Sequence, residues 1–512
     1  MCGGIFLRKT TFIKNALFLT VTSLILRFVG VVLRIWLSGI LGAEGMGLYQ
    51  LIISVYVLFS AFAAGGLTTA VTRQVADRLS FNDKKGAKRA MGVSVALTLF
   101  VALLSVVIIY AFSNEIARYF IKDIRAEAAL KTLCLGLPFM GVASCFKGYF
   151  LARRKASKPS FALILEQAVR IVLIIVLVSG ASNLSLSAAC ATVLLCDGIS
   201  EGASCLYLYF CYLKDKKILR GGGQQIRFKF LLKENLRISV PITAGKYLST
   251  FLRTVENILV PQNLARYTDS YAKSLEQFGM IKGMALPIMF FPASLLSSIT
   301  TLLIPEISQA KAKGDKTTIQ KAVGKSFKIT LYSSYILSGI FFVLAKRLGV
   351  LIYKSEEVGF LIKALSPLVP VMYLDSMADG LLKGLDRQNN TLLHSFIDSM
   401  LRITLILIFV QYFGMFAFLS IMFISNFLTC FLNGHKLVKD TGIKLSFKNL
   451  FLKPIIFTAL SISFCYFVLL PLKNIANILY VAVFIVFSVL TYVLLLFFGK
   501  LLTKKQIFAL YK

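Results

Sequence analysis

Long apolar stretches alternate with short polar segments along the whole chain. Each stretch has about 20 or more mostly apolar residues, the length that an α-helix needs to cross a bilayer. The stretches lie at residues 14–41, 47–76, 89–113, 128–152, 159–180, 185–213, 233–261, 277–306, 320–345, 360–383, 391–411, 415–435, 453–471 and 476–499. The pattern predicts an all-α polytopic membrane protein with about 14 transmembrane helices.

Lysine and arginine are unevenly divided between the polar segments. Those at 77–89, 152–159, 213–233, 307–321 and 435–453, with the two termini, hold roughly three times as many as the alternate segments. The positive-inside rule therefore predicts that both termini are cytoplasmic. The N-terminus resembles an uncleaved signal anchor, because basic residues precede a span longer than the core of a signal peptide.

Composition narrows the class of protein. Of 512 residues, 57% are hydrophobic, and 57 Lys and Arg against 23 Asp and Glu give a net charge of +34. In a membrane protein much of this surplus is a topology signal and an attraction to anionic lipid. We therefore expect membrane lipids as partners, and no nucleic acid. Nine cysteines without a CxxC pair and two histidines predict neither disulfides nor a zinc site; whether another metal binds is left open.

Enzyme chemistry is not indicated by the sequence. Gly221, Gly222 and Gly223 are not followed by the Lys-Ser/Thr pair of a phosphate-binding loop. No nucleophile is accompanied by a base and an orienting group. We expect no ATP site, no cofactor and no catalytic activity.

Cations also occur inside two of the apolar stretches. Arg27 and Arg34 lie seven residues apart, and Lys246 and Arg253 repeat this spacing 219 residues later. Seven residues are two helical turns, so each pair projects from one face. Left unpaired near the bilayer centre, four cations would cost roughly 10 to 14 kcal/mol. A shared polar cavity is the favoured interpretation; the alternative is that one arginine snorkels and the other pairs with a carboxylate.

The two halves of the chain are related at a constant spacing of 232 residues from Gly47 onward. Proline and intramembrane arginine are rare in such a chain, so their matches are informative. The matched pairs are Gly47 and Gly279, Thr68 and Thr300, Thr69 and Thr301, Gly92 and Gly324, Ser94 and Ser326, Pro138 and Pro370, Gly148 and Gly380, and Arg170 and Arg402. We predict two parallel six-helix repeats. The change of spacing from 219 to 232 implies a 13-residue insertion, which we place in an extracytoplasmic loop within 261–278.

The repeat predicts the domain organisation. Residues 1–213 form an N-terminal lobe with helices 1 to 6, and 214–232 form a cytoplasmic linker. Residues 233–438 form a C-terminal lobe with helices 7 to 12, and 439–512 hold two extra helices and a basic tail. The extra helices carry almost no intramembrane charge, so we expect a lipid-like face on them.

Two further cations lie beside interruptions in helices 2 and 8. Arg73 follows the Gly65 and Gly66 pair, and Lys282 precedes Pro287; glycine pairs and prolines weaken a helix. Both cations are candidate cavity residues. For Arg73 the alternative is an anchoring role at the cytoplasmic end of its helix.

Acidic residues also lie within the apolar stretches. Glu166 with Arg170 and Asp398 with Arg402 are spaced i,i+4, which predicts neutralisation within one helix. Asp197 with Glu201 and Asp375 with Asp379 are acid pairs at the same spacing, and they either hold a cation or partner the cavity arginines. The candidate ion-coupling residues are Asp197, Glu201 and Asp398.

Four segments resemble a known family. They are TSLILRFVGVVLRIWLSGILGAEGMGLYQL, GGLTTAVTRQVADR, VPITAGKYLSTFLRTVENILVP and GMALPIMFFPASLLSSITTLLIPEISQA. Over essentially the whole chain the sequence is similar to the stage V sporulation protein B group. That group lies in the polysaccharide-exporter and MurJ-like lipid II flippase branch of the multidrug/oligosaccharidyl-lipid/polysaccharide (MOP) superfamily.

The resemblance implies a two-lobed, V-shaped transporter of the MATE and MurJ type in the bacterial cytoplasmic membrane. A cationic central cavity would take a lipid-linked, pyrophosphate-bearing sugar, and the two extra helices would form a groove for its polyprenyl tail. Related flippases use arginines of helices 1, 2 and 8. Arg27, Arg34 and Arg73 match by position, whereas helix 8 offers Lys282 in place of an arginine. Cell-wall synthesis enzymes are candidate partners.

Two function classes follow. The favoured one is an alternating-access flippase of a lipid II-like peptidoglycan precursor, serving the spore cortex. The alternative is a cation-coupled antiporter of organic cations from the same superfamily, whose members usually use acidic residues in the lobes. The cationic first helix favours an anionic substrate. A scaffold for wall synthesis is a third, weaker reading, because it gives no reason for buried cations at matched depths.

Overall fold

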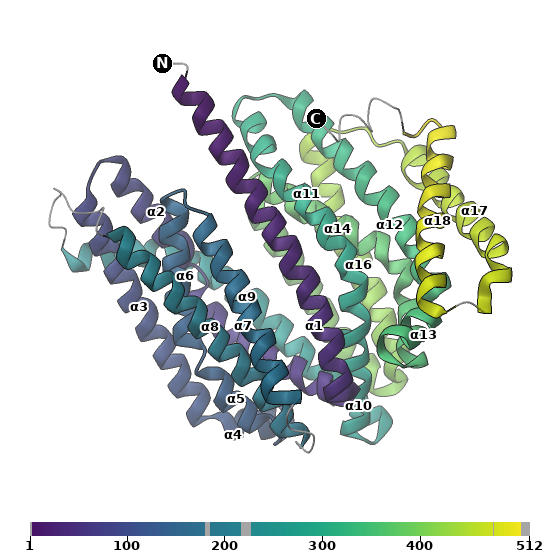
Figure 1. The fold of residues 1–512 in the computed structure, drawn as a ribbon, viewed down its shortest axis with the longest axis horizontal. Helices are drawn as coiled ribbons and strands as arrows, with labels where there is room; N and C mark the ends of the chain where they lie inside the picture. The colour runs from purple at the N-terminus through teal and green to yellow at the C-terminus, as the bar shows by residue number, and fades with distance from the viewer. Residues whose placement is uncertain (1–2, 180–184, 217–226, 475, 503–512) are drawn as a thin grey trace. The chain divides into compact units, whose positions relative to one another are not determined.

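The computed structural model describes residues 3–179, 185–216, 227–474 and 476–502, and within these ranges it contains helices and no strand (Figure 1). The predicted all-α class is confirmed. In chain order the elements are α1 (Gly3–Ala64), α2 (Leu67–Ser80), α3 (Lys84–Ala111), α4 (Ser113–Glu115), η1 (Ile116–Ile121), α5 (Ala126–Cys134), α6 (Leu137–Ala152), α7 (Ser157–Ser179), α8 (Leu186–Lys216), α9 (Phe228–Thr268), α10 (Tyr271–Gly279), η3 (Met280–Ala285), α11 (Leu286–Ala312), α12 (Lys316–Tyr353), α13 (Glu356–Leu365), η4 (Ser366–Leu368), α14 (Val369–Gly384), α15 (Gln388–Leu405), η5 (Ile406–Val410), α16 (Gln411–Thr441), η6 (Lys448–Leu452), α17 (Lys453–Val468), η7 (Leu470–Asn474) and α18 (Asn477–Phe498).

Ten helical segments among the described residues are long and apolar enough to cross a membrane. Two of them, Thr22–Ser80 with 59 residues and Gln388–Thr441 with 54, are far longer than the roughly 20 residues that one crossing needs. Each contains a glycine in the left-handed region, Gly42 with φ 66° and Gly414 with φ 56°. These glycines break the long segments into two helices each, as the fourteen-stretch pattern requires.

The internal repeat is visible in the backbone. Left-handed residues recur at the predicted spacing of 232, as Asn82 with Gly314, Lys122 with Lys354, and Arg154 with Asp386. The first residues of α6 and α14 are also 232 positions apart, as are their last residues, and a proline occupies the first turn of both helices. Matching turns and helix bounds show that the two repeats share one architecture.

By their internal contacts, the residues divide into two compact units. Unit 1 comprises 1–33 and 44–262, and unit 2 comprises 34–43 and 263–512. Most of α9 therefore belongs to unit 1. The predicted lobes follow chain order, whereas the units group residues by packing. Of the predicted linker, residues 217–226 lie outside the described ranges.

Helix α9 is held in unit 1 by polar contacts along much of its length. The Arg78 guanidinium of α2 pairs with Glu234 at 2.6 Å, and the Asn235 amide donates to the Ser94 hydroxyl of α3 at 2.6 Å. Farther along, the Thr254 hydroxyl donates to the backbone carbonyl of Ser54 at 2.9 Å. Buried polar side chains with partners fix the register of such a helix.

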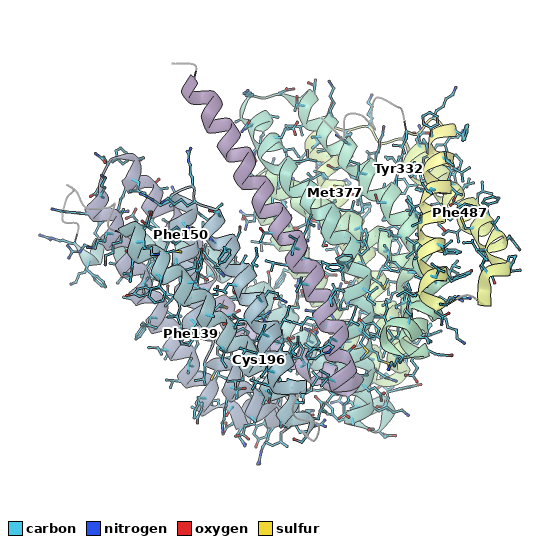
Figure 2. The ribbon with its side chains drawn as sticks, in the orientation of Figure 1. Phe139, Phe150, Cys196, Tyr332, Met377 and Phe487 are labelled. Atoms are coloured by element: carbon cyan, nitrogen blue, oxygen red, sulfur yellow. The ribbon has the colours of Figure 1, made fainter. Side chains whose placement is uncertain are left out.

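Each unit has its own side-chain core (Figure 2). In unit 1 an apolar cluster includes Phe150, Tyr149 and Tyr212, and the two tyrosine rings meet edge to face at 5.0 Å. In unit 2 the pair α17 and α18 packs on α12, as Figure 1 shows in yellow. Phe484 and Tyr492 of α18 are buried in this core.

The segment 261–278 is not a loop, so the prediction for the insertion is wrong in this respect. Helix α9 continues to Thr268, and α10 begins at Tyr271 after only two non-helical residues. Ser270 caps α10, because its side chain accepts a hydrogen bond from the Lys273 backbone N–H. The insertion therefore lengthens helices, which keeps its backbone groups hydrogen-bonded.

Candidate functional site

The junction of α1 and α2 is a close contact point within unit 1. The helix is interrupted at Gly65 and Gly66, as predicted from the glycine pair. A β-carbon added at Gly66 would lie 2.9 Å from the Thr243 side-chain oxygen and closer still to the Ser239 carbonyl oxygen. Only glycine therefore lets α9 approach the junction so closely.

Lys246 lies at this junction. Its ammonium group donates a hydrogen bond to the carbonyl oxygen of Gly65 at 2.5 Å. A carbonyl group carries no net charge, so the contact orients the lysine without neutralising it. Directly beside Lys246, the Tyr247 ring of α9 meets the Phe62 ring of α1, with the ring centroids 6.0 Å apart.

The other three candidate cations of unit 1 are exposed. Arg27 lies in α1, Arg73 in α2 and Arg253 in α9, two turns beyond Lys246. Arg73 makes a long, exposed contact with Asp77 at 3.9 Å, and such a pair contributes little energy. Within the part of the chain that the structure describes, Arg253 has no carboxylate partner.

The remaining two candidates belong to unit 2. Arg34 is half-buried and close enough to Tyr353 of α12 to interact with it electrostatically. The Tyr353 hydroxyl donates to the Met284 carbonyl oxygen at 2.9 Å. Met284 lies in the π-helical turn η3, which also carries the half-buried Lys282. Tyr353 thus links Arg34 to the turn that holds Lys282, and π-helical turns often occur at functional sites.

The acidic residues of unit 1 have partners of their own. Arg170 of α7 pairs with Glu166 at 3.4 Å, as the spacing predicted, but also with Asp197 of α8 at 2.7 Å. The Tyr56 hydroxyl of α1 donates to the Glu201 carboxylate at 2.6 Å. In a low-dielectric surrounding an ionised carboxylate needs such partners. Asp197 and Glu201 are therefore held by Arg170 and Tyr56, not by a cavity arginine.

Unit 2 contains two corresponding groups. Arg402 pairs with Asp398 at 3.2 Å within α15, and the Ser425 hydroxyl of α16 contacts both side chains. In the second group, His394 of α15 shares a hydrogen bond of 2.7 Å with the Asn433 side-chain oxygen. The Asn433 amide in turn donates to Asp375 of α14 at 2.8 Å.

A nearby acid, Asp379, pairs with Lys383 one turn later in α14, at 2.6 Å.

Sequence reasoning named the acids and arginines of these groups but missed Tyr56, Ser425, His394 and Asn433. Their signal is weak, because a single hydroxyl, amide or imidazole within an apolar stretch is common in packed membrane helices. The described residues contain no group of three or more His, Cys, Asp or Glu that could hold a metal ion.

The chain is similar to several known proteins. A family model described as "Polysaccharide biosynthesis protein" matches residues 12–311. Stage V sporulation protein B of Bacillus subtilis (strain 168) is 25% identical over 403 residues, which cover 78% of each chain. Sporulation protein YkvU of the same organism is 25% identical over 363 residues, 70% of this chain and 78% of the relative.

A third relative in that organism, lipid II flippase MurJ, is 20% identical over 344 residues and 62% of each chain. Among solved structures, a lipid II flippase MurJ in an inward closed conformation matches with a TM-score of 0.72 and 14% identity, covering 94% of this chain and 98% of that one. An inward-facing MATE multidrug transporter of the MOP superfamily matches with a TM-score of 0.66 and 14% identity, covering 83% and 98%. At these identities the structural matches show the fold alone.

Proposed function

Because this chain belongs to the polysaccharide biosynthesis protein family, we propose that it flips a lipid-linked, pyrophosphate-bearing oligosaccharide across the bacterial cytoplasmic membrane. The substrate that we propose is a lipid II-like peptidoglycan precursor, moved by alternating access. Two of the curated relatives are named for sporulation and a third for lipid II flipping, which supports a role in forming the spore cortex. We propose that both termini face the cytoplasm, where cell-wall synthesis enzymes would supply the substrate.

One observation carries the choice of substrate: the intramembrane acids have partners, whereas several intramembrane cations do not. Asp197 and Glu201 are held by Arg170 and Tyr56. Within the described residues, Arg34 and Arg253 pair with no carboxylate, and Lys246 contacts only a backbone carbonyl oxygen. The charge that is not neutralised within the membrane helices of this protein is therefore positive. A positive site favours a diphosphate substrate over an organic cation.

We propose that Arg27, Arg34, Arg73, Lys246, Arg253 and Lys282 bind the anionic head of this substrate. An arginine holds two phosphate oxygens through its planar fork, while a lysine contributes a single charge that can move with the substrate. Arg73 and Lys246 lie near the break between α1 and α2, and Lys282 lies in the π-helical turn η3. Residues beside such interruptions can change position without unfolding a continuous helix.

The acid groups remain our candidates for ion coupling. Asp197, Glu201 and Asp398 each have a neutral or cationic partner. An ion that binds to one of these carboxylates would have to displace the side chain that already pairs with it in the structure. This role is therefore secondary to the cationic residues in our proposal.

The proposal is tested by the lipid that the purified protein retains. We expect native mass spectrometry of the full-length protein to detect a polyprenyl diphosphate-sugar adduct, and Arg253→Ala to lose it while keeping ordinary phospholipids. Uptake of an organic cation into vesicles, with no retained polyprenyl lipid, would instead support the antiporter.

A further inference from the structure

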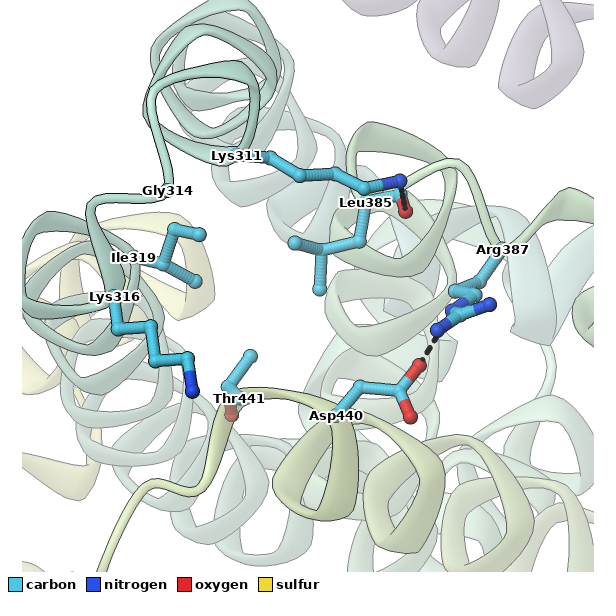
Figure 3. A pocket seen from close by; sticks show the side chains of 8 residues that line it. All are labelled: Lys311, Gly314, Lys316, Ile319, Leu385, Arg387, Asp440 and Thr441. Carbon is cyan, nitrogen blue, oxygen red and sulfur yellow. Dashed lines mark hydrogen bonds and ion pairs between the residues drawn. The ribbon is translucent and has the colours of Figure 1, made fainter.

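A pocket of about 200 Å³ opens at one end of unit 2 (Figure 3). It is formed where α11 ends, α12 begins, α14 turns into α15, and α16 ends. The residues that line it are Lys311, Gly314, Lys316, Ile319, Leu385, Arg387, Asp440 and Thr441. Six of these eight residues lie in segments 307–321 and 435–453, which are among the basic ones that the positive-inside rule assigns to the cytoplasm.

The lining carries surplus positive charge. Three cations, Lys311, Lys316 and Arg387, face a single carboxylate, Asp440. Figure 3 shows the three basic side chains reaching the opening from different segments. Two charged residues lie just outside the lining: the Lys436 ammonium contacts Asp440 at 3.1 Å, and the Asp386 carboxylate lies 3.8 Å from the Lys311 ammonium. The charges of Lys436 and Asp386 cancel. Two positive charges therefore remain for a ligand.

The hydrogen bonds of the pocket leave donors available. Arg387 uses its Nε to donate to Asp440 at 2.7 Å, and among the described residues its two terminal nitrogens have no hydrogen-bond acceptor. Lys311 donates to the Leu385 carbonyl oxygen at 2.7 Å. Lys316, the first residue of α12, pairs with no carboxylate in the described ranges. Asp440 thus orients the Arg387 guanidinium through Nε. The two terminal nitrogens of Arg387 and the Lys316 ammonium remain to bind an anion.

The matching end of unit 1 is built from different side chains. At the matching end of unit 1, Asp215 is held by Lys155 and by the Tyr149 hydroxyl at 2.8 Å, and the Tyr149 ring packs on Tyr212. The residue 232 positions after Tyr149 is Leu381, which has no hydroxyl and a smaller side chain. The second repeat therefore has no hydroxyl at the position where Tyr149 binds Asp215 in the first repeat.

We propose that this pocket binds a phosphate group, either the headgroup of an anionic phospholipid or a soluble phosphate. Two surplus charges, a free guanidinium fork and an ammonium match the charge and geometry of a phosphate ester. The volume holds one such group. An anionic inner leaflet supplies this chemistry at high local concentration. The site lies within unit 2, and the proposal does not depend on which substrate the protein carries.

The test compares Lys316→Ala with a matched control, Lys84→Ala. Lys84 is the repeat counterpart of Lys316 and opens α3 after the capping residue Asp83, as Lys316 opens α12 after Asp315. Full-length protein in detergent is titrated with phosphatidylglycerol in one arm and with inorganic phosphate in the other. Binding is followed by native mass spectrometry and by the shift in melting temperature.

We expect Lys316→Ala to weaken binding about tenfold, as for loss of one charge-assisted hydrogen bond, and Lys84→Ala to leave it unchanged. Dependence on Lys316 in the lipid arm alone identifies a headgroup site, and dependence in the phosphate arm identifies a soluble ligand. Equal binding by wild type and Lys316→Ala in both arms overturns the proposal. An equal loss in the two variants does so as well, because it would reflect general surface charge.

Discussion

Arg170 and Arg253 both lie inside helices of membrane length, yet their surroundings give them different roles. Arg170 is half-buried and pairs with Glu166 and with the buried Asp197, so its charge is used within unit 1. Arg253 is exposed on α9 and has no carboxylate partner among the described residues. At the residue scale, the partner of a charge therefore separates a structural arginine from a candidate binding arginine.

Replacing a binding arginine is expected to stop transport and leave folding intact. We predict that Arg253→Ala and Arg27→Ala are inserted and melt like wild type but do not export the lipid-linked sugar. Arg→Lys is expected to give intermediate activity, since lysine keeps the charge and loses the bidentate grip. Flipping is measured in proteoliposomes, with the exposed Arg118→Ala as control. Wild-type flipping by both alanine variants would refute a binding role.

Replacing Arg170 should have the opposite result. Arg170→Ala leaves Asp197 buried without its cation, and breaking a buried pair in this way costs about 3–5 kcal/mol. The expected outcome is a clearly lower melting temperature in detergent. The matched control is Arg73→Ala, whose pair with Asp77 is exposed on both sides and is worth about 0–1 kcal/mol. Equal melting temperatures for the two variants would contradict this assignment.

At the scale of the element, helices are interrupted at glycine or before proline, and they approach each other closely at glycine. The break between α1 and α2 is covered by α9, and the π-helical turn η3 precedes the proline of α11. In unit 2, α17 and α18 cover part of α12, where Ile462 of α17 lies against Gly339. These contacts depend on small side chains.

A larger side chain at Gly66 is expected to separate α9 from the junction. Gly66→Val forces a shift, because even a β-carbon would meet the Ser239 carbonyl; overpacking typically costs about 1–3 kcal/mol. Gly30→Val is the control, since no atom from outside its own stretch of helix lies within 4 Å of its β-carbon position among the described residues. A thermal melt compares the two variants. No difference between them would show that the contact is not needed for stability.

The last two helices are expected to act on the lipid tail. α17 and α18 expose apolar side chains, including Phe464, Phe467 and Leu490. A chain ending near Lys448 should still fold, since the two repeats precede it, but should transport long polyprenyl substrates poorly compared with short ones. The measurement compares flipping of both chain lengths by truncated and full-length protein. An unchanged preference for long chains after truncation would rule out a tail groove.

At the scale of the whole molecule, surplus positive charge suggests the driving force. A lipid diphosphate carries about two negative charges, and moving one charge across 100 mV is worth about 2.3 kcal/mol. With the cytoplasm negative, outward movement of the anion is favoured. The site that we propose, when empty, would carry the opposite sign, so the same field would return it toward the inside.

We therefore predict that the membrane potential drives flipping. Collapsing the potential in vesicles, while the pH gradient is kept, should stop outward movement of the substrate. Collapsing the pH gradient alone serves as the control and should have little effect. Unchanged flipping after depolarisation would exclude this mechanism and return attention to Asp197, Glu201 and Asp398 as coupling residues.

Much of the fold was determined by the sequence alone. Bilayer-length apolar runs predict the helices because each helix satisfies its own backbone hydrogen bonds within the membrane. Rare residues such as Pro138 and Pro370 established the repeat, and the left-handed turns at Arg154 and Asp386 confirm it. The resemblance to the MurJ-like group is confirmed by the family match and the relatives. Local patterns were sufficient here because helix formation is local.

The partners of the charged residues were decided only by the tertiary structure. An i,i+4 spacing predicted Glu166 for Arg170, but not Asp197, which comes from another helix. Nor could local spacing indicate that Lys311, Lys316 and Arg387 come together beside Asp440 in one pocket. Such pairings depend on how distant helices pack and rotate against each other, and no local pattern in an apolar stretch encodes that rotation.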